Sequence, residues 1–464
     1  MSMRFGLIIF VCGLFSNKIT AQIRFSDQQF FDVVIKNHPL AKQAKLETQL
    51  GEKAVLSAQG GFDPKAYAQS NQKNFNSTSY YNLLNIGLKV PTWYGVEVKS
   101  GFESNQGNFL NPQEKTPPSG LWYAGASFNL GKGLFIDQRR AELFKAKVYY
   151  QSTFFEQKLQ LNELIYESGY AYWNWFMAYH SMQILDDAFR LANERFTAVK
   201  RTAELGDRPE IDAVEAQIQV QNRESMLRNF ETEYLSSGYK IASYLWSEQM
   251  IPLELDSLTL PLSIDSIRNP LSPVLTNQEI DSAVANHPYL QITNFKIKSL
   301  EIEKKLKREQ LKPEVEIHYN FLNQPIQNNP FSNMSLNNYK WGLTFEMPIL
   351  LRKERGELAK TQLKLQDENY NLENSRAYLE YKIKNAIVEY TNAIDQVAIF
   401  EQSTSDTKKL LDAEIEMFET GESSLFLINA REMAYIQAKL KWVESIAKSK
   451  QSFLRLNFSL AKLI

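Results

Sequence analysis

The stretch LDDAFRLANERFTAVKRTA, residues 185–203, decides the fold. Its apolar residues step by 4, 3, 4, 3 and 4 positions, as Leu185, Phe189, Ala192, Phe196, Val199 and Ala203. This is the heptad spacing of a coiled-coil seam. The stretch lies inside a longer run, Asp137 to Leu205, that contains no proline and only one glycine. At about 1.5 Å per residue, such a helix is roughly 100 Å long, and no compact domain buries helices of that length singly.

A second run of the same kind, residues 355–420, also lacks proline. Each run ends at a glycine, Gly206 in the first and Gly421 in the second. Glycine readily adopts the positive φ that closes a helix end. Apolar residues at helical spacing then begin a return helix, which we expect to reach about Trp246 in the first case and Ile464 in the second. The sequence therefore predicts two long helical hairpins.

The chain is internally duplicated. Asn37-His38-Pro39 recurs as Asn286-His287-Pro288 (287 − 38 = 249), whereas the glycines that close the two long helices lie closer together (421 − 206 = 215). The first copy therefore carries 34 extra residues (249 − 215) before its long helix. We divide the chain into a first repeat at 22–246, a Pro-rich connector at 247–275 and a second repeat at 276–464. Each repeat opens with a helix, expected to end near Gln59 and Leu311.

Alternating segments follow these helices. In one of them, Leu84, Ile86, Leu88 and Val90 alternate with Asn85, Gly87 and Lys89, and similar segments occupy residues 96–103, 122–130, 314–321 and 340–347. Alternation over about ten residues, with aromatic residues near the ends, is typical of strands in a membrane β-barrel. The connections divide into a short turn at 91–95 and long polar loops at 72–79, 107–120 and 323–338. A secreted β-sandwich is the alternative that the strands alone leave open.

Composition excludes several classes of protein. The net charge of −1 with 23% charged residues gives no reason to expect nucleic-acid binding. Residues 1–21 have the pattern of a secretory signal peptide, and the only cysteine, Cys12, lies inside it. Beyond that segment no run of about 18 apolar residues is present, so we expect no helical membrane span. An exported chain of this kind is either soluble or crosses a membrane as strands.

The order of elements, given twice, resembles the TolC-type outer-membrane efflux channel family over essentially the whole mature chain. The resemblance implies an α+β fold in which long antiparallel helical hairpins form a periplasmic α-barrel. It also implies a homotrimer whose strands close one shared transmembrane β-barrel in outer-membrane lipid of a Gram-negative bacterium. The partners would be a periplasmic adaptor (membrane fusion) protein and, through it, an inner-membrane RND or ABC transporter. Most of the chain would lie in the periplasm.

The resemblance also assigns roles to the hairpin tips and to the ends of the strands. The adaptor would dock on Gly206, Asp207, Arg208, Pro209, Gly421, Glu422, Ser423 and Ser424. The candidates for lining a closed aperture are Asp212, Glu215, Phe426 and Asn429. The candidates for the membrane interface are the aromatic residues Trp93, Tyr94, Trp122 and Trp341. Local chemistry alone also explains the tips, because glycine closes a helix and Ser423, Ser424 or Asp207 can cap the next one.

The 34 extra residues of the first copy are about what two more strands and a turn require. The family usually has four strands per protomer, so we expect six here and a wider barrel. An even number of added crossings returns the chain to the periplasmic side, where the long helix begins. In this arrangement Trp93 and Tyr94 lie at the periplasmic interface. The alternative is that residues 80–107 form an extracellular hairpin or extend the ordinary strands above the membrane.

The sequence contains no catalytic constellation, no cofactor motif and no metal-ligand spacing, since its four histidines are scattered. The function that the resemblance implies is that of a passive exit duct of a tripartite efflux or type I secretion system, opened by adaptor docking at the tips. A rival hypothesis is an outer-membrane-anchored periplasmic coiled-coil scaffold or adhesin without transport. A secreted enzyme is a third and weaker hypothesis.

Overall fold

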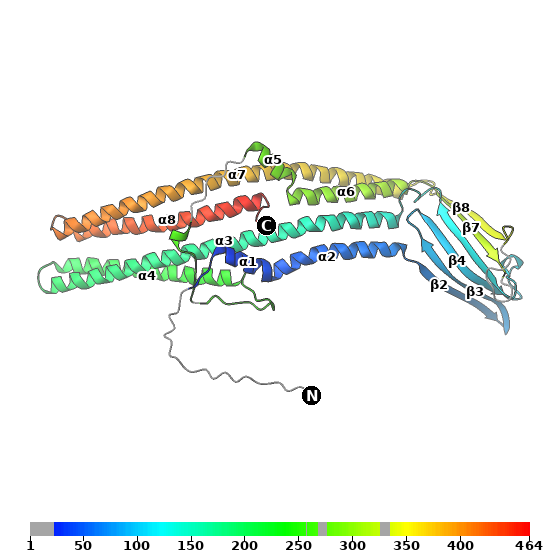
Figure 1. Cartoon of the computed structure of the whole chain (residues 1–464), viewed down its shortest axis with the longest axis horizontal. Coiled ribbons are helices and arrows are strands. Elements are labelled where there is room, and N and C mark those ends of the chain that lie inside the picture. The colour runs from blue at the N-terminus through cyan, green and yellow to red at the C-terminus, as the bar shows by residue number, and fades with distance from the viewer. Residues whose placement is uncertain (1–22, 257, 268–275, 325–334) are drawn as a thin grey trace, which may run out of the picture. The chain divides into compact units, whose positions relative to one another are not determined.

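The computed structural model describes residues 23–256, 258–267, 276–324 and 335–464. The predicted signal peptide lies outside these residues, as do much of the end of the connector and the middle of the loop after residue 323. Helices, one six-stranded antiparallel sheet and a short parallel pair of strands make up the regular structure of the described residues (Figure 1). Among the described residues, no helix has both the length and the apolar character needed to cross a bilayer.

Each half of the chain begins with two short helices. In the first half these are α1 (Asp27–Asn37) and α2 (Pro39–Gln59), and in the second half α5 (Asn277–Ala285) and α6 (Pro288–Glu309). The capping boxes at Ser26 and Thr276 are both formed, which satisfies backbone donors at the helix starts. We expected one continuous helix in each half. Pro39 and Pro288 instead divide it, because proline restricts the residue before it to extended conformations.

Six strands form one antiparallel sheet in the order β2-β3-β4-β5-β7-β8. Four come from the first half: β2 (Lys65–Phe75), β3 (Thr78–Pro91), β4 (Val96–Gln106) and β5 (Leu121–Asn129). Two come from the second half: β7 (Glu314–Asn323) and β8 (Tyr339–Glu346). The sheet therefore contains the two additional strands expected from the extra residues of the first copy. Figure 1 shows it beyond the ends of α2 and α6, which belong to the same compact unit.

The expectation of a long loop at 72–79 is wrong. Strand β2 extends to Phe75 and β3 begins at Thr78, so only Asn76 and Ser77 turn the chain. Both residues have positive φ (48° and 57°), as in the two-residue hairpin turns that match the twist of a sheet. The polarity of the segment was misleading, because its side chains belong to a strand with few large apolar residues.

Two long helices follow the strands. The first is α3 (Gln138–Glu204), with its return helix α4 (Glu210–Ala242), and the second is α7 (Arg352–Glu419), with its return helix α8 (Leu425–Ser459). The bounds of both long helices lie within three residues of those expected. On α3 the seam positions Leu185, Ala192 and Val199 are buried, as the heptad spacing requires.

Short elements complete the chain. A two-stranded parallel pair joins β1 (Ile23–Arg24) to β6 (Thr259–Leu260) in the connector. Single 3₁₀ turns lie at η1 (Gly60–Phe62), η2 (Pro112–Glu114) and η3 (Ile264–Ser266). The described part of the connector contacts α3, since the His180 ring nitrogen lies 2.8 Å from the Leu262 carbonyl oxygen.

The chain divides into two compact units. One unit contains residues 40–164, 274–387 and 456–464, and holds the sheet with α2, α6 and the adjoining parts of the long helices. The other contains residues 1–39, 165–273 and 388–455, and holds both hairpin tips. In the second unit an aromatic core includes the buried residues Phe30, Tyr172, Trp175 and Phe176.

Candidate functional site

The two faces of the sheet differ in chemistry. The strand register places Ile86 opposite Phe102, and Phe102 opposite Trp122. We call this the apolar face. It also carries Leu84, Leu88, Val98, Phe128, Ile317, Phe321, Trp341, Leu343 and Phe345. Many of these side chains are exposed, with Trp341 at 61% and Phe345 at 67%. A contiguous exposed apolar surface marks contact with a membrane or another protein.

The opposite face, which we call the polar face, carries charged and amide side chains on every strand. Its residues include Gln69, Asn71, Asn85, Lys89, Lys99, Glu103, His318, Asn320 and Lys340. Alternation of an apolar and a polar face is the pattern of strands that separate lipid from a water-filled interior. The sheet therefore has the chemistry of a barrel wall.

Glycines on the polar face make room for two tyrosines. Gly87 and Gly101 are cross-strand partners on β3 and β4, with Tyr67 and Tyr123 on the strands that flank them. The two tyrosine hydroxyls are hydrogen-bonded to each other above the glycines, and Tyr123 also donates to Asn85 Oδ1 at 2.9 Å. A Cβ at either glycine would lie 2.6 Å from a tyrosine hydroxyl. Glycine is required here because each ring lies across the neighbouring strand.

The four aromatic residues predicted at the membrane interface lie at two levels of the sheet. Trp93 and Tyr94 occupy the turn between β3 and β4, where the Trp93 ring stacks on Phe62 after α2 with 4.2 Å between centroids. This turn is therefore at the helical end of the sheet. Trp122 and Trp341 lie near the starts of β5 and β8, on the strand ends that face the long loops. The described sheet thus has aromatic residues toward both ends, as interfacial girdles do.

Both hairpin tips close by the same backbone geometry. Gly206 and Gly421 have φ of +81° and +83°. The Asp207 amide donates to the Thr202 carbonyl at 3.0 Å, and the Glu422 amide donates to the Met417 carbonyl at 2.8 Å. Together with the glycine amide bonds, these contacts form the Schellman motif that ends a helix at a glycine in the left-handed conformation. The glycine prediction is confirmed at both tips.

The side chains of the two tips differ. In the first tip the Arg208 guanidinium lies 3.7 Å from the Asp212 carboxylate and 4.7 Å from the centroid of the Phe418 ring on α7. Pro209 occupies the N-cap position of α4 without a side-chain hydrogen bond, so Asp207 does not cap this helix.

In the second tip, Ser424 Oγ accepts a hydrogen bond from the Leu427 amide at 3.4 Å. Ser423 Oγ donates instead to Glu414 Oε1 at 2.5 Å. Gly206, Asp207, Pro209, Gly421, Glu422 and Ser424 are all exposed. The tips therefore expose polar residues to solvent, and hydrogen bonds within each tip fix the backbone.

A buried ionic cluster lies behind the tips and joins three helices. Arg195 of α3 contacts both carboxylate oxygens of Glu432 on α8, at 3.0 and 3.1 Å. Arg223 of α4 is fully buried, and its guanidinium lies 3.7 Å from the same carboxylate. Asn429 of α8 accepts from Arg195 at 3.3 Å and donates to Glu215 of α4 at 3.1 Å. Burial lowers the pKa of Arg223, and the nearby Glu432 carboxylate opposes this.

Apolar contacts join the same three helices. Val199 of α3, Ala216 of α4 and Leu425 of α8 pack together, with Phe418 against them. Attraction between unlike charges is strong where water is excluded, and leaving such a charge unpaired is costly. The return helix α4 is therefore attached to α3 and α8 by one shared set of contacts.

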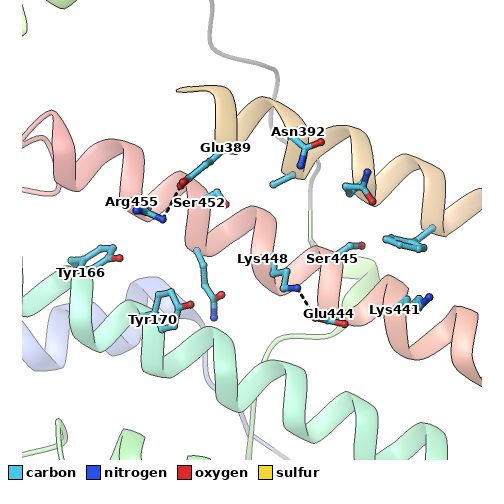
Figure 2. A pocket seen from close by; sticks show the side chains of 14 residues that line it. Tyr166, Tyr170, Glu389, Asn392, Lys441, Glu444, Ser445, Lys448, Ser452 and Arg455 are labelled. Atoms are coloured by element: carbon cyan, nitrogen blue, oxygen red, sulfur yellow. Dashed lines mark ion pairs between the residues drawn. The ribbon is translucent and has the colours of Figure 1, made fainter. Parts of the chain in front are cut away.

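A polar groove of about 620 Å³ lies between α3, α7 and α8 in the unit that holds the tips (Figure 2). Tyr166 and Tyr170 form one wall. Arg455 pairs with Glu389 at 2.8 Å, and Lys448 pairs with Glu444 at 2.6 Å. These charged side chains of the groove are thus paired with opposite charges in the same groove, which is typical of a solvated helix face. Among the described residues, no group of three or more His, Cys, Asp or Glu is arranged to hold a metal ion.

Comparison with solved structures identifies the fold. A membrane protein from Pseudomonas aeruginosa matches with a TM-score of 0.70 and 12% identity, over 94% of this chain and 92% of that one. The open state of the MtrE outer-membrane channel of Neisseria gonorrhoeae matches with a TM-score of 0.69 and 13% identity, over 94% and 88%. The CmeC outer-membrane channel of Campylobacter jejuni matches with a TM-score of 0.66 and 12% identity, over 94% and 85%.

The chain has the fold of an outer-membrane channel. The resemblance to the TolC-type family, drawn from the order of elements, is confirmed at the level of the fold. No family model matches the sequence, and a search of the curated proteins finds no match either.

Within this channel fold, the predicted aperture residues do not form one group. Asp212 is paired with Arg208, and Phe426 is 67% exposed. Glu215 and Asn429 are bonded to each other in the ionic cluster, and Asn429 is buried. The sequence prediction missed Arg195, Arg223 and Glu432. One signal was present, because Ala216, Arg223 and Leu227 are spaced by seven and four, which places an arginine on the buried stripe of α4.

Proposed function

We propose that this protein is a passive exit duct in the outer membrane of a Gram-negative bacterium, serving a tripartite efflux or type I secretion system. The observation that carries the proposal is a sheet with one apolar and one polar face whose outer strands lack partners. In the part of the chain that the structure describes, β2 and β8 are each paired on one side only. An open edge in lipid leaves backbone groups unsatisfied at several kcal/mol each, by an order-of-magnitude estimate.

Joining copies edge to edge satisfies those groups. We propose a homotrimer, so that three sheets of six strands close one barrel of 18 (3 × 6). With strands about 4.8 Å apart and tilted by about 40°, such a barrel is roughly 36 Å across, against roughly 24 Å for twelve strands. Barrels of this size enclose a water-filled channel. The apolar face would contact outer-membrane lipid, and the polar face would line the interior.

The hairpin tips are the proposed docking site for a periplasmic adaptor protein, which would connect the duct to an inner-membrane RND or ABC transporter. The exposed tip residues support this role, because Schellman motifs hold their backbone in place while their side chains remain accessible. A rigid polar surface loses little conformational entropy on binding. Most of the chain would lie in the periplasm.

The ionic cluster is the proposed latch of the resting state. Opening the tips would require α4 to move against α3 and α8. That movement separates Arg223 from Glu432 and Glu215 from Asn429, and it breaks the packing of Ala216 on Val199. An adaptor that binds the moved state more tightly than the resting one would shift the equilibrium toward opening. Asp212 and Glu215 lie three residues apart on α4 and would restrain its first turns.

Single-channel recording tests the duct. The purified protein, inserted into a planar lipid bilayer, is expected to give discrete conductance steps. A folded protein that binds the bilayer without conductance would overturn the proposal and favour an anchored scaffold.

Replacing Asp212 and Glu215 together by alanine tests the latch. The double variant loses the bonds to Arg208 and Asn429, so we expect higher resting conductance and greater antibiotic leak in cells. Asp187→Ala on the exposed surface of α3 is the control, since its partner Arg190 is equally exposed. Conductance unchanged by the double substitution would mean that these carboxylates do not restrain the tips.

A further inference from the structure

The loop between β4 and β5, residues 107–120, is folded against the sheet. It leaves β4 at Gly107 and reaches β5 at Gly120, and both glycines have positive φ (150° and 73°). Thr116 fixes its middle to the end of β4: the Thr116 amide donates to the Asn105 carbonyl at 3.1 Å, and the Asn105 amide donates to Thr116 Oγ1 at 2.9 Å. The loop therefore has a defined position at the end of the sheet away from the helices.

That position is over the polar face. A hollow of about 490 Å³ is bounded on one side by Gln113, Glu114 and Lys115 of the loop. Its other walls come mostly from the polar face of the sheet, and include Asn85 of β3, Glu103 of β4 and Lys340 of β8. A loop directed away from the sheet could not share a hollow with side chains that lie on three separate strands.

We propose that this loop is an inward-folded constriction that narrows the outer mouth of the duct and sets which solutes pass. The inference rests on the proposed function, because only in a closed barrel does the polar face become a lumen. Three copies of the loop would then project into a barrel much wider than one of twelve strands. Constrictions lined by charged side chains govern both the conductance and the selectivity of a pore.

The charges at the hollow define what the constriction recognises. Glu103 and Glu114 supply carboxylates, and Lys115 and Lys340 supply ammonium groups. The two signs are balanced, so the loop offers partners to solutes that carry charges of both signs rather than to one kind of ion. Changing a single loop charge should therefore shift ion selectivity in a direction set by the sign of the change.

Single-channel recording of loop variants tests the constriction. In channels whose tips are open, replacing residues 111–118 by Gly-Ser-Gly should raise single-channel conductance by about twofold or more, since the loop no longer narrows the outer mouth. Lys115→Glu should move the reversal potential in a salt gradient toward cations, and Glu114→Lys should move it toward anions. A shortened loop with unchanged conductance and unchanged selectivity in both charge variants would overturn the proposal.

Cysteine modification gives a second measurement that does not depend on a loop deletion folding correctly. In Glu114→Cys, a bulky thiol reagent should reduce the conductance of an open channel within one recording. Thr78→Cys is the matched control, because Thr78 is exposed at the same end of the sheet and does not line the hollow. Modification at Glu114→Cys without a fall in conductance would place the loop outside the lumen. Absence of channels from the wild-type protein would instead contradict the proposed function.

Discussion

His287 has a buried imidazole that the fold holds in its neutral form. Its Nδ1 accepts a hydrogen bond from the Tyr289 amide at 3.2 Å and so caps α6. Burial and the charges of Lys382 and Lys158 lower the pKa of His287 to about 4. A protonated Nδ1 cannot accept this hydrogen bond, so protonation removes the cap as well as placing a charge in a buried site.

We expect acid to destabilise the unit that contains α6. The pKa is lower in the folded state than in the unfolded state, so the stabilisation is complete above about pH 6.5 and is lost as the pH falls toward 4. At pH 5 the loss is about 2 kcal/mol. His287→Asn keeps an acceptor at the cap but does not titrate. Thermal unfolding between pH 7.5 and 5 should therefore depend less on pH in the variant than in the wild type, and equal dependence would contradict this account.

Glu432 is the residue on which the ionic cluster depends, because both Arg195 and Arg223 face its carboxylate. Glu432→Ala leaves two guanidinium groups without a counter-charge, one of them fully buried. We expect a loss of about 3 to 5 kcal/mol in unfolding free energy and higher resting conductance. Glu194→Ala, which breaks only an exposed pair with Arg190, should change neither. Equal behaviour of the two variants would show that the cluster stabilises nothing.

Thiol labelling of the turn between β3 and β4 tests how the chain crosses the membrane. Tyr94 is 85% exposed in this turn, at the helical end of the sheet. In a duct with six spanning strands per protomer it faces the periplasm. An impermeant thiol reagent should therefore label Tyr94→Cys only after the outer membrane is permeabilised.

Thr78→Cys, at the opposite end of β3, should be labelled in intact cells. If Tyr94→Cys is labelled in intact cells as well, the turn lies outside and the two additional strands do not span the membrane. Gly95 is a poorer site for this test, since its φ of +79° would strain any other residue.

The elements were predicted with uneven success, for physical reasons. The long helices were found almost to the residue, because an uninterrupted heptad pattern and a closing glycine are local signals. Strand β3 was found because Leu84, Ile86 and Leu88 alternate with smaller or polar residues. No alternating segment was identified at strand β2, since Ala66, Ala68 and Ser70 give its apolar face too little hydrophobic contrast.

The ionic cluster could not be predicted as a unit. Arg195, Arg223 and Glu432 come from three helices, and Glu432 is more than 200 positions from either arginine (432 − 223 = 209). Their meeting depends on how α3, α4 and α8 pack, and sequence patterns do not give that packing. The tips, in contrast, are local turns, so their glycines and the Ser424 cap followed from the sequence.

For the molecule as a whole, the free edges of the sheet predict its assembly. Among the described residues, β2 and β8 each lack a strand partner on one side. A lone protomer would expose these backbone groups, so we expect a trimer that remains intact in mild detergent. Multi-angle light scattering corrected for bound detergent measures its mass. A proline substitution in the edge strand β2 tests the interface. Ala68→Pro removes a backbone N–H donor and should weaken the trimer. A folded, monodisperse monomer of the wild-type protein would contradict the assembly.

The pairing of β5 with β7 determines when the protein can finish folding. Asn129 lies opposite Glu316, so this pairing joins residues that are 187 positions apart (316 − 129 = 187). The ribosome makes the first four strands long before the last two. Until the second repeat arrives, β5 has an unsatisfied edge that invites aggregation. If the chain is exported as proposed, we expect the early strands to need shielding by a chaperone, and we expect a product truncated before β7 to be degraded rather than to form a smaller pore.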